Sequence, residues 1–258
     1  MKRLVYQVYV GKKSALYDHC TASVKAYCEQ HGFDYVLQTT PILFITPDPF
    51  MTGRSKEAVE RLGYLPIFEK ENAFTYLKTY DQVAIIDSDI YIRSDSPSIF
   101  DDVPASVDFA AVVERSMPIS SQYLAKIVNY SRMQYSSIRN VDWKWNDRGA
   151  EFYNMGVMVL NKSITKFLNG ETPKQFLSRP RFKPFVDGQG PWKWSTDQTL
   201  LNTWVKEEQM KVKQLDWRWN GLFTANTNIH DCYFVHFFLK DKLPDRGENV
   251  KQLMENIN

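Results

Sequence analysis

The chain has few cysteines. Three are spread over its 258 residues, and no two of them form a CxxC pair. An odd number of unclustered cysteines argues against a secreted disulfide framework and against a zinc finger. We therefore expect a protein of a reducing compartment, the cytoplasm. The three positions are Cys20, Cys28 and Cys232.

Long apolar runs and an excess of one charge are also missing. No stretch approaches the roughly 20 apolar residues of a membrane-spanning helix. The apolar start, residues 4–10, is interrupted by Gln7 and has no small-residue cleavage site, so it predicts a strand rather than a signal peptide. The net charge is +2, with Lys and Arg dispersed, which excludes the basic footprint of a nucleic-acid partner. We expect neither a transmembrane segment nor bound nucleic acid.

The composition is instead that of a folded domain, with 43% hydrophobic and 24% charged residues. Strand and helix patterns alternate in the first hundred residues, which is typical of a sheet with helices on its faces. The sequence predicts one α/β domain with an elaborated second half. Strands are expected at 4–10, 33–38, 82–87, 152–161, 212–217 and 233–238, and helices at 14–32, 55–63, 66–80, 121–134 and 196–209.

A short tryptophan pattern recurs in the second half. "DWKWN" at 142–146 and "DWRWN" at 216–220 are close copies, and "PWKWS" at 191–195 is a looser one. Trp alternating with a basic residue is what a strand presents when one face is packed and the other is wet, and we favour this interpretation. The alternative is that the Trp rings form platforms for sugar rings.

The stretch "VAIIDSDIYI", residues 83–92, runs an apolar strand into two carboxylates. Residues two apart on a strand point to the same side, so Asp87 and Asp89 can share one cation. Two buried carboxylates need a counter-charge, and oxygen ligands suit Mg²⁺ or Mn²⁺. Ligands of open α/β sheets also bind beyond the carboxyl ends of the strands. The alternative is structural: Asp87 closes the strand and Asp89 makes a turn or cap.

No GxxxxGK or GxGxxG motif offers a backbone cradle for phosphate, so a metal would have to neutralise a diphosphate. An ordered set of segments resembles nucleotide-sugar-dependent glycosyltransferases of the GT-A fold, most closely the retaining group that includes glycogenin and the lipooligosaccharide galactosyltransferases. The resemblance runs from the first strand to about Pro244. It is carried by "FEK" (68–70), "IIDSDIYI" (85–92), "FYNMGVMVLN" (152–161), "STDQTLLN" (195–202), "LDWRWNG" (215–221) and "VHFFLKDKLP" (235–244).

The resemblance implies a GT-A domain spanning 1–258, a mixed central sheet flanked by helices, with a nucleotide-binding half at 1–115 and an acceptor-binding and catalytic half at 116–258. It also implies a nucleotide-sugar donor, with a UDP-sugar as the expected form, and Mn²⁺ or Mg²⁺. The acceptor would be a glycan, glycolipid or glycoprotein. The implied metal ligands are Asp87, Asp89 and His236. The implied donor contacts are Tyr9, Val10, Gly11, Lys70, Ser88, Asn154, Gly156, Lys240 and Lys242, and the implied catalytic pair is Asp197 and Gln198.

Several of these residues have ordinary alternatives. A histidine in a strand is more often a core residue than a ligand, Gly156 could mark a bulge, and Thr196 could simply cap a helix with an acidic first turn. Lys70 could be a surface lysine. Leu239 stands where the family has Gly before the lysine at 242, which makes Lys240 a rival phosphate contact.

The implied reaction is glycosyl transfer with retention, in which the metal and Lys242 stabilise the leaving diphosphate while Gln198, with Asp197, stabilises the sugar. An inverting enzyme would need a carboxylate base, for which Glu151, Asp216 or Asp231 would be available. Two other functions stay open. One is a haloacid-dehalogenase-type phosphatase, although Tyr91 and the late motif count against it, and the other is a carbohydrate-binding module without catalysis.

Overall fold

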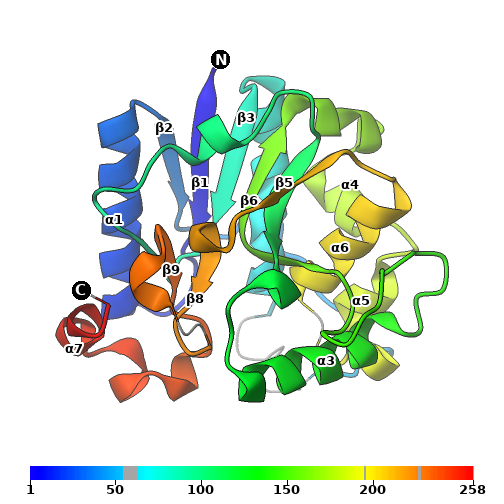
Figure 1. The fold of residues 1–258 in the computed structure, drawn as a ribbon. Coiled ribbons are helices and arrows are strands. Elements are labelled where there is room, and N and C mark those ends of the chain that lie inside the picture. The colour runs from blue at the N-terminus through cyan, green and yellow to red at the C-terminus, as the bar shows by residue number, and fades with distance from the viewer. Residues whose placement is uncertain (55–62, 195, 226–227, 258) are drawn as a thin grey trace.

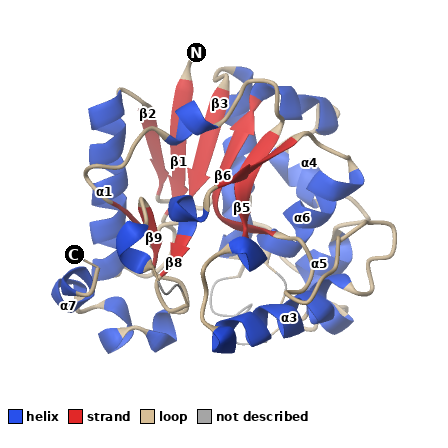
Figure 2. Ribbon diagram, viewed as in Figure 1, coloured by secondary structure: helices blue, strands red, loops and turns tan. Residues whose placement is uncertain are grey.

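The computed structural model describes residues 1–54, 63–194, 196–225 and 228–257. Its centre is a six-stranded mixed sheet in the order β2-β1-β3-β6-β5-β7 (Figures 1 and 2). Strand β6 runs antiparallel to its neighbours β3 and β5, while the pairs β1–β2, β1–β3 and β5–β7 are parallel. The six strands are β1 (Arg3–Val8), β2 (Asp34–Gln38), β3 (Gln82–Ile86), β5 (Phe109–Val113), β6 (Tyr153–Asn161) and β7 (Val212–Leu215).

Apolar alternation along the strands builds two cores, one on each face of this sheet. Leu4 and Tyr6 of β1 face one core, and Val5 faces the other. The helix α1 covers the second face, and the helices α4, α5 and α6, at the right of Figure 1, cover the first. The α-helices are α1 (Ala15–His31), α3 (Ser121–Tyr135), α4 (Pro173–Leu177), α5 (Lys183–Asp187), α6 (Asp197–Glu207) and α7 (Val250–Glu255).

A second sheet of three short strands lies beyond the carboxyl end of β3. Its order is β4-β9-β8, with β4 (Ile90–Ile92), β8 (Gly221–Leu222) and β9 (Phe234–His236). The chain therefore passes from the large sheet to the small one through residues 87–89. The 3₁₀ helices are η1 (Pro66–Lys78), η2 (Ile99–Asp102), η3 (Glu114–Ser116), η4 (Lys162–Phe167), η5 (Gly190–Trp192), η6 (Trp217–Asn220), η7 (Ile229–Asp231), η8 (Lys240–Lys242) and η9 (Pro244–Gly247).

Most of the predicted elements are confirmed, and the α/β class with a mixed sheet is correct. The segment 66–80 is helical, as 3₁₀ rather than α-helix, and the predicted helix at 55–63 lies outside the described residues except for its last one. The three cysteines are free and buried. Within the described parts of the chain, no helix is long and apolar enough to cross a membrane.

The strand interpretation of the tryptophan pattern is wrong. Among the described residues of its three copies, none lies in a strand. In the two closest copies the aspartate turns the chain instead: Asp142 Oδ1 accepts from the backbone N–H of Lys144 at 2.9 Å, and Asp216 Oδ1 accepts from that of Arg218 at 3.0 Å. A side chain that bonds its own backbone two residues on favours a turn over a strand. The predicted strand 212–217 accordingly ends at Leu215.

Candidate active site

Asp87 and Asp89 lie on the turn that joins β3 to β4. Strand β3 ends at Ile86, so the two carboxylates converge because of this turn and not because of strand alternation. Asp87 is anchored from the large sheet, since its N–H donates to the Gly156 carbonyl at 2.8 Å. Asp89 is anchored from the small sheet, since its carbonyl accepts from Phe237 N–H at 2.9 Å.

Strand β9 brings His236 to this turn. It pairs antiparallel with β4, and His236 is the register partner of Ile90. His236 Nε2 lies 3.3 Å from Asp89 Oδ1 and 4.0 Å from Asp87 Oδ2. One possible ligand atom from each residue falls within 4.8 Å of the others. The predicted metal ligands therefore form one cluster, although they come from two sheets.

The chemistry of this cluster fits a hard divalent cation. Two carboxylate oxygens and one imidazole nitrogen converge, and the carboxylates remain partly accessible, with 25% and 21% of the side chains of Asp87 and Asp89 exposed. Carboxylate-rich sites with open positions suit Mn²⁺ or Mg²⁺. The residues present thus fit the metal that the sequence predicts.

Lys70 supplies a fixed positive charge beside the cluster. Its Nζ lies 2.8 Å from Asp87 Oδ1 and 2.7 Å from Asp197 Oδ2, and it donates to the Met155 carbonyl at 3.2 Å. Only 7% of the Lys70 side chain is exposed, so the surface-lysine alternative is wrong. A buried ammonium between two carboxylates is held in one geometry. Lys70 therefore links the predicted metal ligands to the predicted catalytic residue Asp197.

The pKa values follow from burial and these charges. Burial is the largest influence on Asp87 and raises its pKa to about 6, against the opposing effect of Lys70. Burial also acts on Asp89, but the charge and hydrogen bond of His236 outweigh it and lower the pKa. Burial alone would lower the pKa of His236, whereas the carboxylate of Asp89 raises it above the ordinary value. The cluster thus responds electrostatically as one unit.

Asp197 and Gln198 begin helix α6, and Thr196 caps it by accepting from Gln198 N–H at 3.2 Å. The capping alternative is therefore correct as a local description. It coexists with the site, because Asp197 pairs with Lys70 and Gln198 Oε1 accepts from Met155 N–H at 3.3 Å. The cap aims the first turn of the helix at the strand that carries Asn154 and Gly156.

Gly156 is needed for the packing of His236. A Cβ at this position would lie 2.5 Å from His236 Cε1 and 3.1 Å from Asn154 Oδ1. Such a contact is far below van der Waals distance, so only glycine fits. Next to it, the pairing of β5 with β6 shifts register between Ala111 and Val112, as the bulge alternative expects.

A cavity of about 250 Å³ opens onto this cluster and unites six predicted residues from three separate segments. It is lined by Val8, Tyr9, Val10, Tyr17, Pro66, Ile67, Lys70, Asp87, Ser88 and Asp89. Eight predicted residues are not among these lining residues: Gly11, Asn154, Gly156, Asp197, Gln198, His236, Lys240 and Lys242. Lys240 Nζ instead donates to Ser14 Oγ at 2.7 Å and pairs with Glu248 at 2.8 Å, while Lys242 lines another cavity with Lys126.

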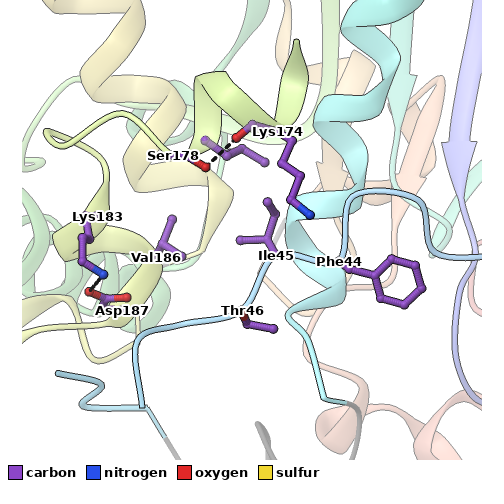
Figure 3. A pocket seen from close by; sticks show the side chains of 9 residues that line it. Phe44, Ile45, Thr46, Lys174, Ser178, Lys183, Val186 and Asp187 are labelled. Carbon is purple, nitrogen blue, oxygen red and sulfur yellow. Dashed lines mark hydrogen bonds and ion pairs between the residues drawn. The ribbon is translucent and has the colours of Figure 1, made fainter. Parts of the chain in front are cut away.

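A further cavity, of about 260 Å³, shares no residue with the predicted site. Figure 3 shows it between the segment around Ile45 and the helices α4 and α5, with Lys183 turned towards Asp187. The Phe44 ring points away from the other labelled side chains. Its walls hold no metal-ligand cluster like that of Asp87, so we do not place the chemistry there. Its lining is Phe44, Ile45, Thr46, Lys174, Leu177, Ser178, Lys183, Val186 and Asp187.

Sequence reasoning missed several buried polar residues around the site. Gln7, a fully buried residue within strand β1, donates from Nε2 to the Asp87 carbonyl at 3.1 Å. Its position inside an apolar strand was a signal that could have been used. Asn220 reaches the site through side-chain contacts with His236 and Asn154, and Glu114 reaches it through Asn154; no local pattern reveals these contacts.

Comparison with known proteins supports the fold. No family model and no curated protein matches the sequence. Among solved structures, the galactosyltransferase LgtC in complex with donor and acceptor sugar analogues is 12% identical to this chain. The match covers 98% of this chain and 94% of the LgtC chain, at a TM-score of 0.58. An active-site mutant of LgtC is 14% identical, and the match covers 99% of this chain and 96% of the mutant chain, at a TM-score of 0.53. The chain therefore shares the fold of the galactosyltransferase LgtC, and the GT-A glycosyltransferase fold predicted from its sequence is confirmed.

Proposed function

We propose that the chain is a metal-dependent glycosyltransferase that moves a sugar from a nucleotide diphosphate donor, a UDP-sugar, to a glycan, glycolipid or glycoprotein acceptor with retention. One observation carries this proposal. Asp87, Asp89 and His236 converge at the carboxyl end of β3, beside a cavity that also contains Tyr9 and Lys70, in a chain with the fold of a galactosyltransferase. Ligands of open α/β sheets bind at such strand ends.

In this proposal Asp87, Asp89 and His236 hold Mn²⁺ or Mg²⁺, which supplies positive charge for the leaving diphosphate when bound. Tyr9, Val10 and Gly11 hold the base of the donor, with Ser88 beside the metal. Residues 1–115 form the nucleotide-binding half and residues 116–258 the acceptor-binding and catalytic half. Lys240 and Lys242 would contact the phosphates after leaving the positions described above.

The chain's own residues then organise the reacting groups. Lys70 pairs with both Asp87 and Asp197 and so offsets part of their negative charge beside a diphosphate. Gln198, fixed by Met155 N–H, places a carboxamide oxygen near the donor sugar, where it stabilises positive charge without titrating. Asn154 and Gly156 flank Met155 on β6, and Gly156 N–H donates to Asn154 Oδ1 at 2.9 Å. Two of the three carboxylates that an inverting enzyme could use as a base are already paired: Glu151 with Lys206 at 3.0 Å and Arg115 at 3.5 Å, and Asp216 with Arg218 at 2.8 Å.

The test is turnover of a panel of nucleotide sugars with Mn²⁺, read as release of the nucleoside diphosphate. We expect release by the wild-type chain and its loss in Asp89→Ala, with folding retained. Asp95→Ala is the matched control, because Asp95 comes just after β4, lies outside the turn that carries Asp89, and is exposed. Turnover of a generic phosphate monoester instead would favour a phosphatase. Binding of sugars without any turnover would favour a carbohydrate-binding module. Either result would refute the proposal.

A further inference from the structure

Four buried polar side chains form a hydrogen-bonded row that ends at His236 of the predicted metal cluster. Glu114, Asn154, Asn220 and His236 are 6%, 8%, 0% and 6% exposed, and they come from four different elements, η3, β6, η6 and β9. Asn154 Nδ2 lies 3.0 Å from Glu114 Oε2, Asn220 Nδ2 lies 2.8 Å from Asn154 Oδ1, and His236 Nδ1 lies 2.9 Å from Asn220 Oδ1. Buried polar groups of this kind are expensive unless every one is satisfied.

The direction of these hydrogen bonds is fixed by a backbone group. Gly156 N–H donates to Asn154 Oδ1 at 2.9 Å, and a backbone N–H can only donate. The oxygen of Asn154 therefore faces Gly156, and its NH₂ faces the Glu114 carboxyl group. Because Asn220 also meets this oxygen, Asn220 must present its own NH₂ there. The assignment of both amides thus follows from the network, whatever the protonation of Glu114.

Only one orientation remains for the last bond in the row. The Asn220 oxygen faces His236 Nδ1, and an amide oxygen can only accept, so Nδ1 must carry a hydrogen. In a neutral imidazole the lone pair then lies on Nε2. Nε2 is the atom that faces Asp89 and Asp87, at 3.3 and 4.0 Å.

We infer that Asn220, held by Asn154 and Glu114, is a positioning residue that fixes His236 as the Nδ1–H tautomer and so presents Nε2 to a divalent cation. The inference rests on the proposed metal-dependent function. Gly156 belongs to the same arrangement, because a Cβ there would lie 2.7 Å from His236 Nδ1 and would displace the ring from Asn220. Groups that hold the distal nitrogen of a ligating histidine are known to set its orientation and basicity.

The sequence supplies a matched control. Asn146 occupies the same place in "DWKWN" that Asn220 occupies in "DWRWN", but it is exposed and its Oδ1 accepts from Arg148 N–H at 2.8 Å. The two positions share their local sequence and differ in their contacts. Asn220→Leu removes the acceptor for Nδ1–H, Asn220→Asp keeps it, and Asn146→Leu affects neither the row nor the cluster.

The first experiment titrates each full-length variant with Mn²⁺ alone and follows binding by the electron paramagnetic resonance of the free ion. We expect Asn220→Leu to weaken affinity by about 10–100-fold, whereas Asn220→Asp restores most of it and Asn146→Leu leaves it unchanged. A purely structural role predicts the reverse order, since a carboxylate buried at this position should disturb the fold more than leucine does. Equal affinity of wild type and Asn220→Leu overturns the inference and leaves the proposed function standing. Absence of Mn²⁺ binding by the wild type overturns both.

The second experiment needs no metal. Long-range ¹H–¹⁵N NMR of the wild-type chain, at a pH where His236 is neutral, reports which ring nitrogen carries the hydrogen. We expect the proton on Nδ1, and in folded Asn220→Leu we expect a mixture of tautomers. A proton on Nε2 in the wild type overturns the inference, irrespective of any activity.

Discussion

Replacement of Lys70 by methionine tests whether this ammonium holds the site together. Methionine keeps most of the side-chain volume but removes the charge that pairs with Asp87 at 2.8 Å and Asp197 at 2.7 Å. Both carboxylates would then lie in a buried region without their counter-charge. Breaking a buried pair by deleting one partner costs about 3–5 kcal/mol, out of a total stability of about 5–15 kcal/mol for a typical domain.

The assay is thermal and urea unfolding of Lys70→Met, followed by circular dichroism without added metal. For a chain of this size about 1 kcal/mol shifts the melting temperature by about 2–4 °C, so we expect a decrease of about 6–20 °C. In the Asp197→Asn background the same substitution should cost less, with a coupling energy of about 0.5–3 kcal/mol, because one of the two stranded carboxylates is gone.

Lys206→Met is the matched control for this prediction. Lys206 is similarly buried and pairs with Glu151 at 3.0 Å, but Glu151 keeps Lys144 at 3.4 Å and Arg115 at 3.5 Å when Lys206 is removed. We expect a loss of only about 1–2 kcal/mol. If Lys70→Met loses no more stability than Lys206→Met, the argument that Lys70 compensates two carboxylates is refuted.

Three further predictions follow from the surroundings of the site. Gly156→Ala should lose Mn²⁺ affinity and about 1–3 kcal/mol of stability, whereas Gly53→Ala, whose Cβ would meet Gly188 O at 2.4 Å, should lose only stability; equal metal affinity of the two variants would contradict this. Burial, and then the charge of Asp197, raises the pKa of Glu71 well above 4.5. The folded state therefore keeps a proton that the unfolded chain releases, and the stability of the wild type falls as the pH rises from 4.5 towards the raised pKa. Urea unfolding across a pH series should therefore show the free energy of unfolding of Glu71→Gln rising relative to that of the wild type as the pH increases. A difference between the two that does not change with pH would count against a protonated Glu71. The Trp194 side chain is 62% exposed, so Trp194→Ala should change stability by less than about 0.5 kcal/mol. If this ring is a platform for the acceptor sugar, the variant should slow transfer to a glycan acceptor but not hydrolysis of the donor. Unchanged transfer would show that Trp194 does not contact the acceptor.

The architecture was predictable because it depends on local patterns. Apolar runs such as that of β3 mark buried strands, and apolar residues at helical spacing mark α1 and α6. The position of the carboxylate pair was predictable for the same reason, since it follows directly from the end of a buried strand. The order of the short segments then pointed to the GT-A fold.

The interior of the site was not predictable, because its contacts join residues that are distant in sequence. Lys70 has a partner in Asp197, and Asn220 has one in Asn154. Neither pairing can be recognised from the hydrophobic periodicity of the sequence. The tryptophan pattern failed for a different reason: its alternation is that of a strand, but Asp142 and Asp216 bond the backbone two residues on, and this local turn overrides the alternation.

The two sheets meet at the cluster of Asp87, Asp89 and His236, and this arrangement has a consequence for heat tolerance. A cation bound there, as we propose, would act as a removable crosslink between β9 and the turn after β3 and would bind only the folded chain. Saturation at about a hundred times the dissociation constant adds about 2.7 kcal/mol. Val235 of β9 and Leu253 of the C-terminal helix α7 belong to the same buried apolar cluster. Chelation should therefore loosen the C-terminal segment first, before the large sheet melts.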